Sequence, residues 1–396
     1  MNTFYSMYDN LVKIPPIKLS DSWLITKYED VKNCLLNTKA FSVRRAGRMF
    51  ENEAIDQEHP KTKFAKDVLH RWIIHMDDGA NDTKKQLVKK IVSFTNGRLE
   101  SEVNLRYEEL RAKLAGKEEY DLKYDFALPI VSSAVMAMLG VERTPQYEQQ
   151  ELKIFRQSEK VAILVEEIIL SMEEVEEMAD SLLYLIKLGA GFDGLDEEPR
   201  IEEFETHYSD FDIQQSLILS TFVYSVPNLI VNAVKGIVEN IEQVNANNLK
   251  KAILEALRIE SPVQAVLRIC TEDTSVGGAI IPVGDTLTVF VGSANRDGSV
   301  EAFADPTKFD LNRKKMPLMT FGYGVHKCIG QAIGMAIGNQ VIKKMWESRL
   351  IQSLRINEAV WDDHVLGYRT MSSFTVSEVP ILEAASADSQ SSVTIE

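Results

Sequence analysis

Residues 214–240 form the stretch that most constrains how this 396-residue chain can fold. The stretch, QQSLILSTFVYSVPNLIVNAVKGIVEN, carries apolar residues at the three- and four-residue spacing of an α-helix. It is apolar nearly all round rather than along one stripe, so it needs protein on every side. We therefore predict a long central helix that passes through the core of a large protein.

Most of the remaining chain shows the same helical spacing. Apolar residues recur at helical intervals over much of 79–240, and another helix is expected over 246–259. Short β-rich runs, separated by Gly, Pro and Asp, follow in 261–297. No linker rich in Gly, Ser or Pro marks a boundary, so we predict a mainly α protein with one domain over 1–382. The small polar residues of 383–396 are predicted to form a disordered tail.

The composition argues against several classes of protein. Apolar residues make up 45% of the chain, but we find no uninterrupted apolar run of the about 18 residues that a membrane span needs. The first residues lack the pattern of a secretory signal, and three cysteines suit a reducing compartment better than a disulfide framework. A net charge of −15 argues against nucleic acid as a partner. We expect a cytoplasmic enzyme that uses neither a membrane nor a nucleic acid.

A glycine-rich loop around Cys328 carries the clearest chemical signal. The stretch FGYGVHKCIG, residues 321–330, leaves three roles open for the cysteine: a packing residue, a catalytic nucleophile or a metal ligand. A nucleophile would need a base, and His326 is poorly placed for this because it lies only two residues away. The glycines also match neither a GxGxxG nor a Walker phosphate loop.

The same loop offers what a metal-bound thiolate needs. Such a thiolate is stabilised by backbone N–H donors or by the N-terminus of a helix. Gly322, Gly324 and Gly330 permit backbone angles that are closed to other residues, and they let the chain pass close to a flat object. A helix can begin at Gln331 and point toward the sulfur. The residues therefore favour a metal ligand.

The loop resembles the haem-binding loop of the cytochromes P450. That pattern, Phe-x-x-Gly-x-x-x-Cys-x-Gly, is matched by Phe321, Gly324, Cys328 and Gly330. The resemblance extends over most of the chain, and it implies the P450 fold, a mainly α-helical triangular prism with a small β-rich portion.

A second P450 signature lies upstream of the loop. Glu255 and Arg258, in EALR, fit the helical Glu-x-x-Arg pair of the family, which can hold an ion-pair network with a later segment. Alone, the pair would be read as a surface salt bridge. Its order relative to the haem loop favours the family interpretation.

The resemblance implies haem b as the cofactor, with the Cys328 thiolate as the axial ligand of iron. Arg268 matches the family position that binds a haem propionate, and His326 matches a second propionate contact. Phe321 is expected to shield the sulfur. In the helix expected to begin near residue 80, Asn81 and Lys85 replace a common His and Arg.

One more family histidine position, three residues before the loop, is Leu318. With Asn81 and Lys85 also substituted, we expect fewer charged groups at the propionates than is usual.

The central helix departs from the family at the oxygen-activating turn. The family commonly has Ala/Gly-Gly-x-Asp/Glu-Thr, whereas alignment places Thr221 and Phe222 at the small pair, Tyr224 at the acid and Ser225 at the threonine. Tyrosine, with an ordinary pKa of about 10, is a poor general acid at neutral pH. Pro227 removes one helical hydrogen bond, which either opens an oxygen groove or only bends the helix.

The resemblance leads to a main hypothesis with two alternatives. The main one is a haem-thiolate monooxygenase or oxidase that acts on a small organic molecule, expected to be a secondary metabolite, by hydroxylation or by oxidative C–C or C–O coupling. The alternatives are a peroxide-driven enzyme and a non-catalytic haem-binding recruitment module. The module is least favoured, because Cys328, Arg268 and Ser225 are retained.

Electrons are expected from a separate ferredoxin or flavodoxin-type donor. In the family fold, several basic segments flank the thiolate side of the haem, where they would form a docking face; solvated helix faces are the simpler interpretation. The acidic segment 190–205 suggests a lid or a contact with a carrier protein as a further partner, although an exposed loop is the simpler interpretation. The residues of the docking face are Lys84, Lys85, Lys89, Lys90, Arg313, Lys314, Lys315, Lys327, Lys343 and Lys344.

Overall fold

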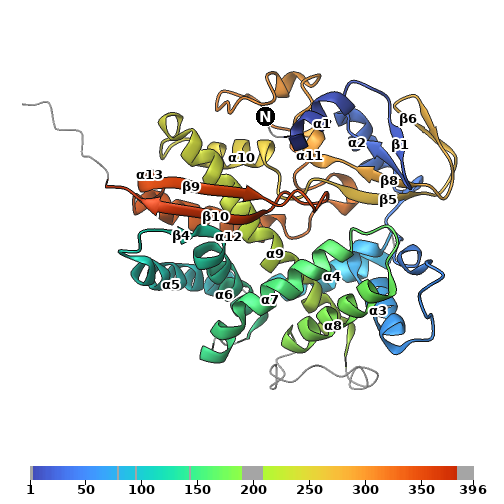
Figure 1. Ribbon diagram of the computed structural model, residues 1–396, viewed down its shortest axis with the longest axis horizontal. Coiled ribbons are helices and arrows are strands. Elements are labelled where there is room, and N and C mark those ends of the chain that lie inside the picture. Colours follow the sequence, from blue (N-terminus) through green and yellow to red (C-terminus); the bar gives the residue numbers. More distant parts are fainter. Residues whose placement is uncertain (1–2, 78–79, 94–95, 142–143, 190–207, 381–396) are drawn as a thin grey trace, which may run out of the picture.

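The computed structural model describes residues 3–77, 80–93, 96–141, 144–189 and 208–380 (Figure 1). The predicted tail over 383–396 and the acidic segment 190–205 lie outside these residues.

Helices dominate the described chain, which confirms the predicted mainly α class. They are α1 (Thr3–Leu11), α2 (Tyr28–Leu36), α3 (Pro60–Arg71), α4 (Ala80–Ser93), α5 (Asn96–Leu114), α6 (Leu128–Leu139), α7 (Pro145–Leu164), α8 (Met172–Gly189), α9 (Asp210–Glu239), α10 (Leu249–Ile259), α11 (Val291–Ala294), α12 (Gln331–Glu347) and α13 (Leu350–Ser353). A π-helical segment, Leu122–Ala127, leads directly into α6.

The strands form three small sheets. The largest has the order β1-β2-β8-β5-β3, the second has the order β4-β10-β9, and β6 pairs with β7 alone. Their bounds are β1 (Ile17–Leu19), β2 (Ser22–Ile25), β3 (Phe41–Ser42), β4 (Tyr120–Asp121), β5 (Val266–Cys270), β6 (Thr274–Val276), β7 (Ala279–Ile281), β8 (Thr286–Val289), β9 (Leu354–Trp361) and β10 (Met371–Glu378). Figure 1 shows the β9–β10 hairpin and the larger sheet at opposite ends, with helices α3 to α8 along the lower side and α1, α2, α10 and α11 above.

Helix α9 is the predicted central helix. It contacts α6, α7, α8, α10 and α12, and most of its side chains are buried. Its start is fixed by a capping box, in which Ser209 and Asp212 satisfy each other's backbone N–H groups. The helix runs on through Pro227, and the side chain of Asn228 donates to the carbonyl of Tyr224 at 2.9 Å. Pro227 therefore does not end the helix.

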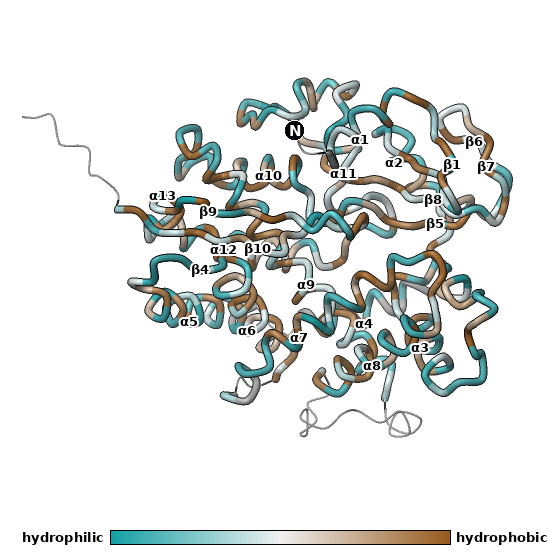
Figure 2. Tube along the Cα trace, viewed as in Figure 1, coloured by the Kyte–Doolittle hydropathy of each residue, from teal (hydrophilic) through white to brown (hydrophobic). Residues whose placement is uncertain are grey.

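Two helical stretches are long and apolar enough to span a membrane by length and composition. They are Leu122–Leu139 and Asp210–Glu239, and their most apolar windows are 78% and 89% buried inside the protein. Polar residues gather on the outer loops and outward helix faces in Figure 2. The apolar surfaces of both stretches are thus covered by other elements, as in core helices.

Candidate functional site

The loop over 321–330 needs glycine where its backbone turns. Gly322 and Gly324 have φ values of +69° and +72°, which side chains rarely adopt. At Gly324 a Cβ would also lie 3.0 Å from the carbonyl oxygen of Leu35 at the end of α2. Two of the three predicted glycines therefore serve the conformation of the loop.

Gly330 serves a different purpose. Its φ is −82°, which any residue can adopt, but a Cβ there would lie 2.7 Å from Cζ of Phe222 on α9. Glycine is needed here because the loop approaches the central helix closely. The sequence pattern gave no sign of this contact.

The sulfur of Cys328 lies in the environment that the loop predicts. The Cys328 amide donates to the carbonyl of Phe321 at 2.8 Å, which closes the loop. Burial raises the pKa of the Cys328 thiol, while the amides of Gly330 and Gln331 and the charge of Lys327 lower it. The side chain nevertheless has exposed surface. The thiol is thus surrounded by protein atoms and still accessible, as an axial ligand must be.

Arg268 supports the same conclusion from β5. Its side chain is 6% exposed, and Nη1 donates to the carbonyl of Leu267 at 2.7 Å. No other hydrogen bond or ion pair joins it to a described residue. Burial, followed by repulsion from Arg45, lowers the pKa of Arg268 to about 10. A buried guanidinium that uses so few of its five donors has N–H groups left for an anion. Its role toward a haem propionate stays a prediction.

The structure shows where the other predicted haem-contact residues lie in the fold. Phe321 and His326 are half-buried in the loop, and His326 ends the short 3-10 turn Gly324–His326. Lys85 is half-buried on α4, the helix that also carries Asn81. Their roles toward the haem stay predictions. Leu318 packs against the apolar cluster beneath the larger sheet, which fits its apolar side chain.

Glu255 and Arg258 form a buried network rather than a surface salt bridge. Both side chains are fully buried, and Arg258 Nε and Nη2 each lie 2.8 Å from a Glu255 oxygen. Arg313 joins them, with Nε 2.9 Å from Glu255 Oε1. Arg313 was predicted to lie on the docking face, and this prediction is wrong because the side chain is buried against Glu255. A buried carboxylate that already binds one arginine can still accept a second.

The three α9 residues predicted to be catalytic differ in what their hydroxyl groups do. Thr221 Oγ1 donates to the carbonyl of Leu217 at 2.7 Å, which turns it back onto its own helix. Ser225 is half-buried, and its hydroxyl makes no hydrogen bond to a described residue. Ser225 is therefore the hydroxyl best able to bind water or a ligand.

Tyr224 is fully buried between aromatic rings. Its ring centroid lies 5.9 Å from that of Phe155 and 5.1 Å from that of Tyr368. Burial raises the pKa of Tyr224 well above its ordinary value. The hydroxyl is thus an even poorer acid than an exposed tyrosine.

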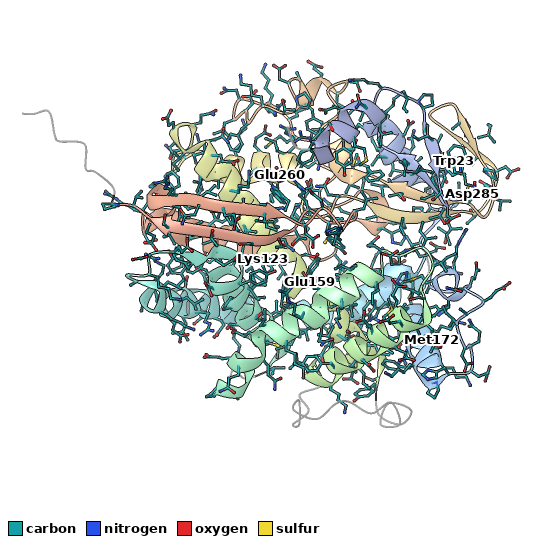
Figure 3. The ribbon with its side chains drawn as sticks, viewed as in Figure 1. Trp23, Lys123, Glu159, Met172, Glu260 and Asp285 are labelled. Atoms are coloured by element: carbon teal, nitrogen blue, oxygen red, sulfur yellow. The ribbon has the colours of Figure 1, made fainter. Side chains whose placement is uncertain are left out.

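A buried lysine that the sequence reasoning missed lies beside Tyr224. Lys123 Nζ donates to Thr370 Oγ1 and to the carbonyl of Met371, both at 2.8 Å, beneath the β9–β10 hairpin (Figure 3). Thr370 Oγ1 in turn donates to Asn228 Oδ1 at 2.8 Å. Burial lowers the pKa of Lys123 to about 8. The only sequence signal was one lysine at the start of a strongly apolar helix.

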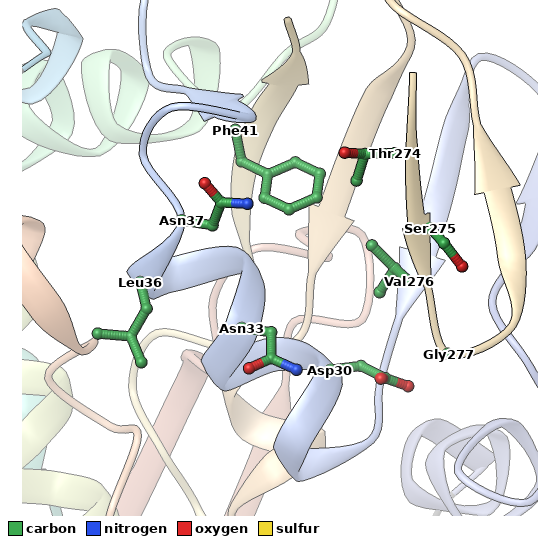
Figure 4. Close-up of a pocket in the computed structure, with 9 residues that line it drawn as sticks. All are labelled: Asp30, Asn33, Leu36, Asn37, Phe41, Thr274, Ser275, Val276 and Gly277. Atoms are coloured by element: carbon green, nitrogen blue, oxygen red, sulfur yellow. The ribbon is translucent and has the colours of Figure 1, made fainter. Parts of the chain in front are cut away.

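A surface cavity of about 410 Å³ lies between α2 and the β6–β7 hairpin (Figure 4), and its lining includes no residue of the haem loop. None of its lining residues was predicted to belong to the site, and we assign it no part in the chemistry. It is lined by Asp30, Asn33, Leu36, Asn37, Phe41, Thr274, Ser275, Val276 and Gly277.

Comparisons with known proteins agree with this geometry. The family model "Cytochrome P450" matches residues 238–345. Cytochrome P450 107B1 of Saccharopolyspora erythraea is 30% identical over 335 residues, covering 79% of this chain and 78% of that protein. Epothilone D-bound cytochrome P450epoK superposes with a TM-score of 0.76 at 20% identity, covering 95% of this chain and 96% of that one. P450BioI in complex with an acylated acyl carrier protein superposes with a TM-score of 0.74 at 21% identity, covering 95% of this chain and 98% of that one.

The fold and the cysteine site define a haem-thiolate protein. The chain belongs to the cytochrome P450 family. It is accordingly a monooxygenase-type oxidoreductase whose cofactor is haem b, with Cys328 as the axial thiolate.

Proposed function

We propose that this P450 oxidises a small organic molecule of secondary metabolism in the cytoplasm, with electrons from a separate ferredoxin or flavodoxin-type donor. One observation carries the proposal: the accessible Cys328 thiol belongs to a loop whose Gly330 packs against Phe222 of α9, one helical turn before Ser225. When bound, the haem supplies reductive activation of dioxygen. The residues of the chain bind the substrate, exclude water and position protons.

Ser225 is the residue of α9 that we assign to proton positioning. Its hydroxyl is available to hold a water molecule, whereas Thr221 is bonded to its own helix and the Tyr224 hydroxyl is buried. Protons would then reach the site through water held at Ser225 rather than from a carboxylic acid. This arrangement is compatible with hydroxylation and with oxidative C–C or C–O coupling.

Peroxide-driven oxidation is the second candidate, because no carboxylate stands at the Tyr224 position to serve dioxygen activation. Turnover driven by NAD(P)H and a surrogate reductase should be compared with turnover driven by peroxide, in wild type, Ser225→Ala and Tyr224→Phe. We expect Ser225→Ala to lower product formed per NAD(P)H and to leave peroxide turnover nearly unchanged. Tyr224→Phe is the matched control on α9 and should change neither.

Turnover with peroxide alone, insensitive to Ser225→Ala, would favour the peroxide-driven enzyme. A folded, haem-loaded protein that shows no turnover under either condition, across a broad substrate panel, would favour the recruitment module.

A carrier-bound substrate is a narrower version of the same proposal. P450BioI has been solved with an acylated carrier protein, and its fold covers 95% of this chain. Pull-down with free and loaded carrier proteins would test this version.

A further inference from the structure

Strand pairing brings three distant segments together beside Arg268. In the β3–β5 pair Ser42 lies opposite Ile269, so the chain that follows Ser42 runs alongside Arg268. Asp77 fixes the third segment, because its carboxylate accepts from Ser42 Oγ at 2.6 Å and from the amide of Val43 at 3.0 Å. Residues 43–45, 75–77 and 268 therefore converge on one place.

Four ionisable side chains meet there, and we call them the Arg45 cluster: Arg45, His75, Glu166 and Arg268. Arg45, His75 and Arg268 are 7%, 5% and 6% exposed. Arg45 Nη1 donates to the carbonyl of Glu167 at 3.1 Å, and Nη2 lies 3.7 Å from Glu166 Oε2. Neither ring nitrogen of His75 makes a hydrogen bond of normal geometry to a described residue.

The charges of the Arg45 cluster do not balance. Two buried guanidinium groups lie near one partly buried carboxylate, Glu166. The other two carboxylates that act on them are Glu167, which is exposed, and Asp77, which is already bonded to Ser42, to Val43 and to Arg44 at 3.3 Å. Burial is the main cause that lowers the pKa values of Arg45 and Arg268 and raises that of Glu166. A buried positive charge without a counter-ion is costly, so the cluster lacks one anion.

We propose that Arg45 and His75, together with Arg268, form a buried carboxylate-binding site. Arg45 and Arg268 supply guanidinium N–H donors, which suit a carboxylate. His75 supplies a ring nitrogen, and the backbone of Val43 is the hydrogen-bonding group that acts on this ring. The carboxylate can come from a haem propionate or from the organic substrate. The propionate is favoured, since α4 carries Asn81 and Lys85 in place of the family's His and Arg.

If the bound carboxylate is a haem propionate, the inference goes beyond the proposed function and does not depend on it. If the carboxylate belongs to the substrate, the inference rests on the proposed function. In either case Arg45 and His75 bind and position a carboxylate. Neither is assigned to the chemical step.

The test measures haem retention rather than turnover. Ferric holoprotein would be mixed with excess apomyoglobin and haem transfer followed, for wild type, Arg45→Gln, His75→Gln and Arg45→Lys. Lys39→Gln is the control, because the Lys39 side chain is 84% exposed and pairs with Glu272 outside the cluster. A propionate site predicts about tenfold faster transfer for Arg45→Gln, as for loss of one charge-assisted hydrogen bond, partial rescue in Arg45→Lys and little change in Lys39→Gln.

The experiment would be repeated with haem dimethyl ester, in which both propionates are esterified and no free carboxylate is left to bind Arg45. The difference between wild type and Arg45→Gln should then disappear. A difference that persists with the ester would mean that Arg45 only supports the fold, and it would overturn the proposal. Should Arg45→Gln fail to fold, His75→Gln and Arg45→Lys carry the same comparison.

A second arm tests the substrate as the source. Dodecanoic acid and methyl dodecanoate would be titrated into each variant while the Soret spin shift is recorded. Unchanged haem transfer, combined with an Arg45-dependent spin shift for the acid but not the ester, would assign the carboxylate to the substrate. If Arg45→Gln and His75→Gln alter neither measurement, no carboxylate is bound at the cluster and the proposal is wrong.

Discussion

Replacing Gly330 by alanine tests how closely the haem loop approaches α9. The backbone at Gly330 has φ −82° and ψ −5°, so alanine is allowed there and any cost comes from the new methyl group. That methyl would lie 2.7 Å from Cζ and 3.0 Å from Cε2 of Phe222, whose side chain is 8% exposed and has little room to move. Overpacking of this kind costs about 1–3 kcal/mol.

Gly334→Ala is the matched control one helical turn further along α12. A Cβ at Gly334 would meet Val226 at 3.5 Å and Phe222 at 4.0 Å, which are ordinary contacts. Since alanine is favoured over glycine inside a helix by ~1 kcal/mol, we expect Gly334→Ala to be neutral or stabilising.

The assay is urea denaturation of the ferric protein, read with the Soret spectrum of the reduced, carbon monoxide-bound form. Gly330→Ala should lower the apparent free energy of unfolding by about 1–3 kcal/mol and increase the fraction without thiolate ligation. Adding Phe222→Leu should recover part of this loss, relative to Phe222→Leu alone. Equal stability of Gly330→Ala and Gly334→Ala would refute the reasoning, because the contact with Phe222 would then carry no cost.

Three further predictions follow from buried and exposed charges. Glu255→Gln should destabilise the protein by about 3–5 kcal/mol in urea, because it leaves Arg258 and Arg313 buried without a counter-charge; a change below about 1 kcal/mol would contradict this. Lys123, with its pKa lowered to about 8, binds fewer protons when folded than when unfolded, so wild-type stability relative to Lys123→Met should rise between about pH 8 and pH 10.4. A flat difference across that range would show that Lys123 is not desolvated. Lys327→Glu should slow reduction by an acidic donor roughly fivefold at low salt and less at high salt, whereas Lys250→Glu on α10 should not; salt-independent rates would contradict the docking face.

Some features of this protein could be predicted from the spacing of nearby residues, and others could not. The haem loop and the Glu255–Arg258 pair were predictable, because a ligand loop and an i,i+3 helical pair are fixed by spacing within a few residues. The central helix was predictable as well, since an apolar surface all round has no other stable place. The role of Arg313 was not, because its partner Glu255 lies 58 residues away and both are charged side chains that local patterns assign to the surface.

Adjacent residues on α9 show the same limit. Tyr224 and Ser225 are neighbours in the sequence, yet one is buried between aromatic rings and the other keeps a free hydroxyl toward the described residues. Which helix face meets the haem depends on how α7, α12 and the turn at Tyr368 pack against it. The cofactor, its cysteine ligand and the helical class can be predicted from local patterns of residues. Which charges are buried together, as at Lys123 and in the Arg45 cluster, follows only from the folded chain, because their burial depends on partners far away in the sequence.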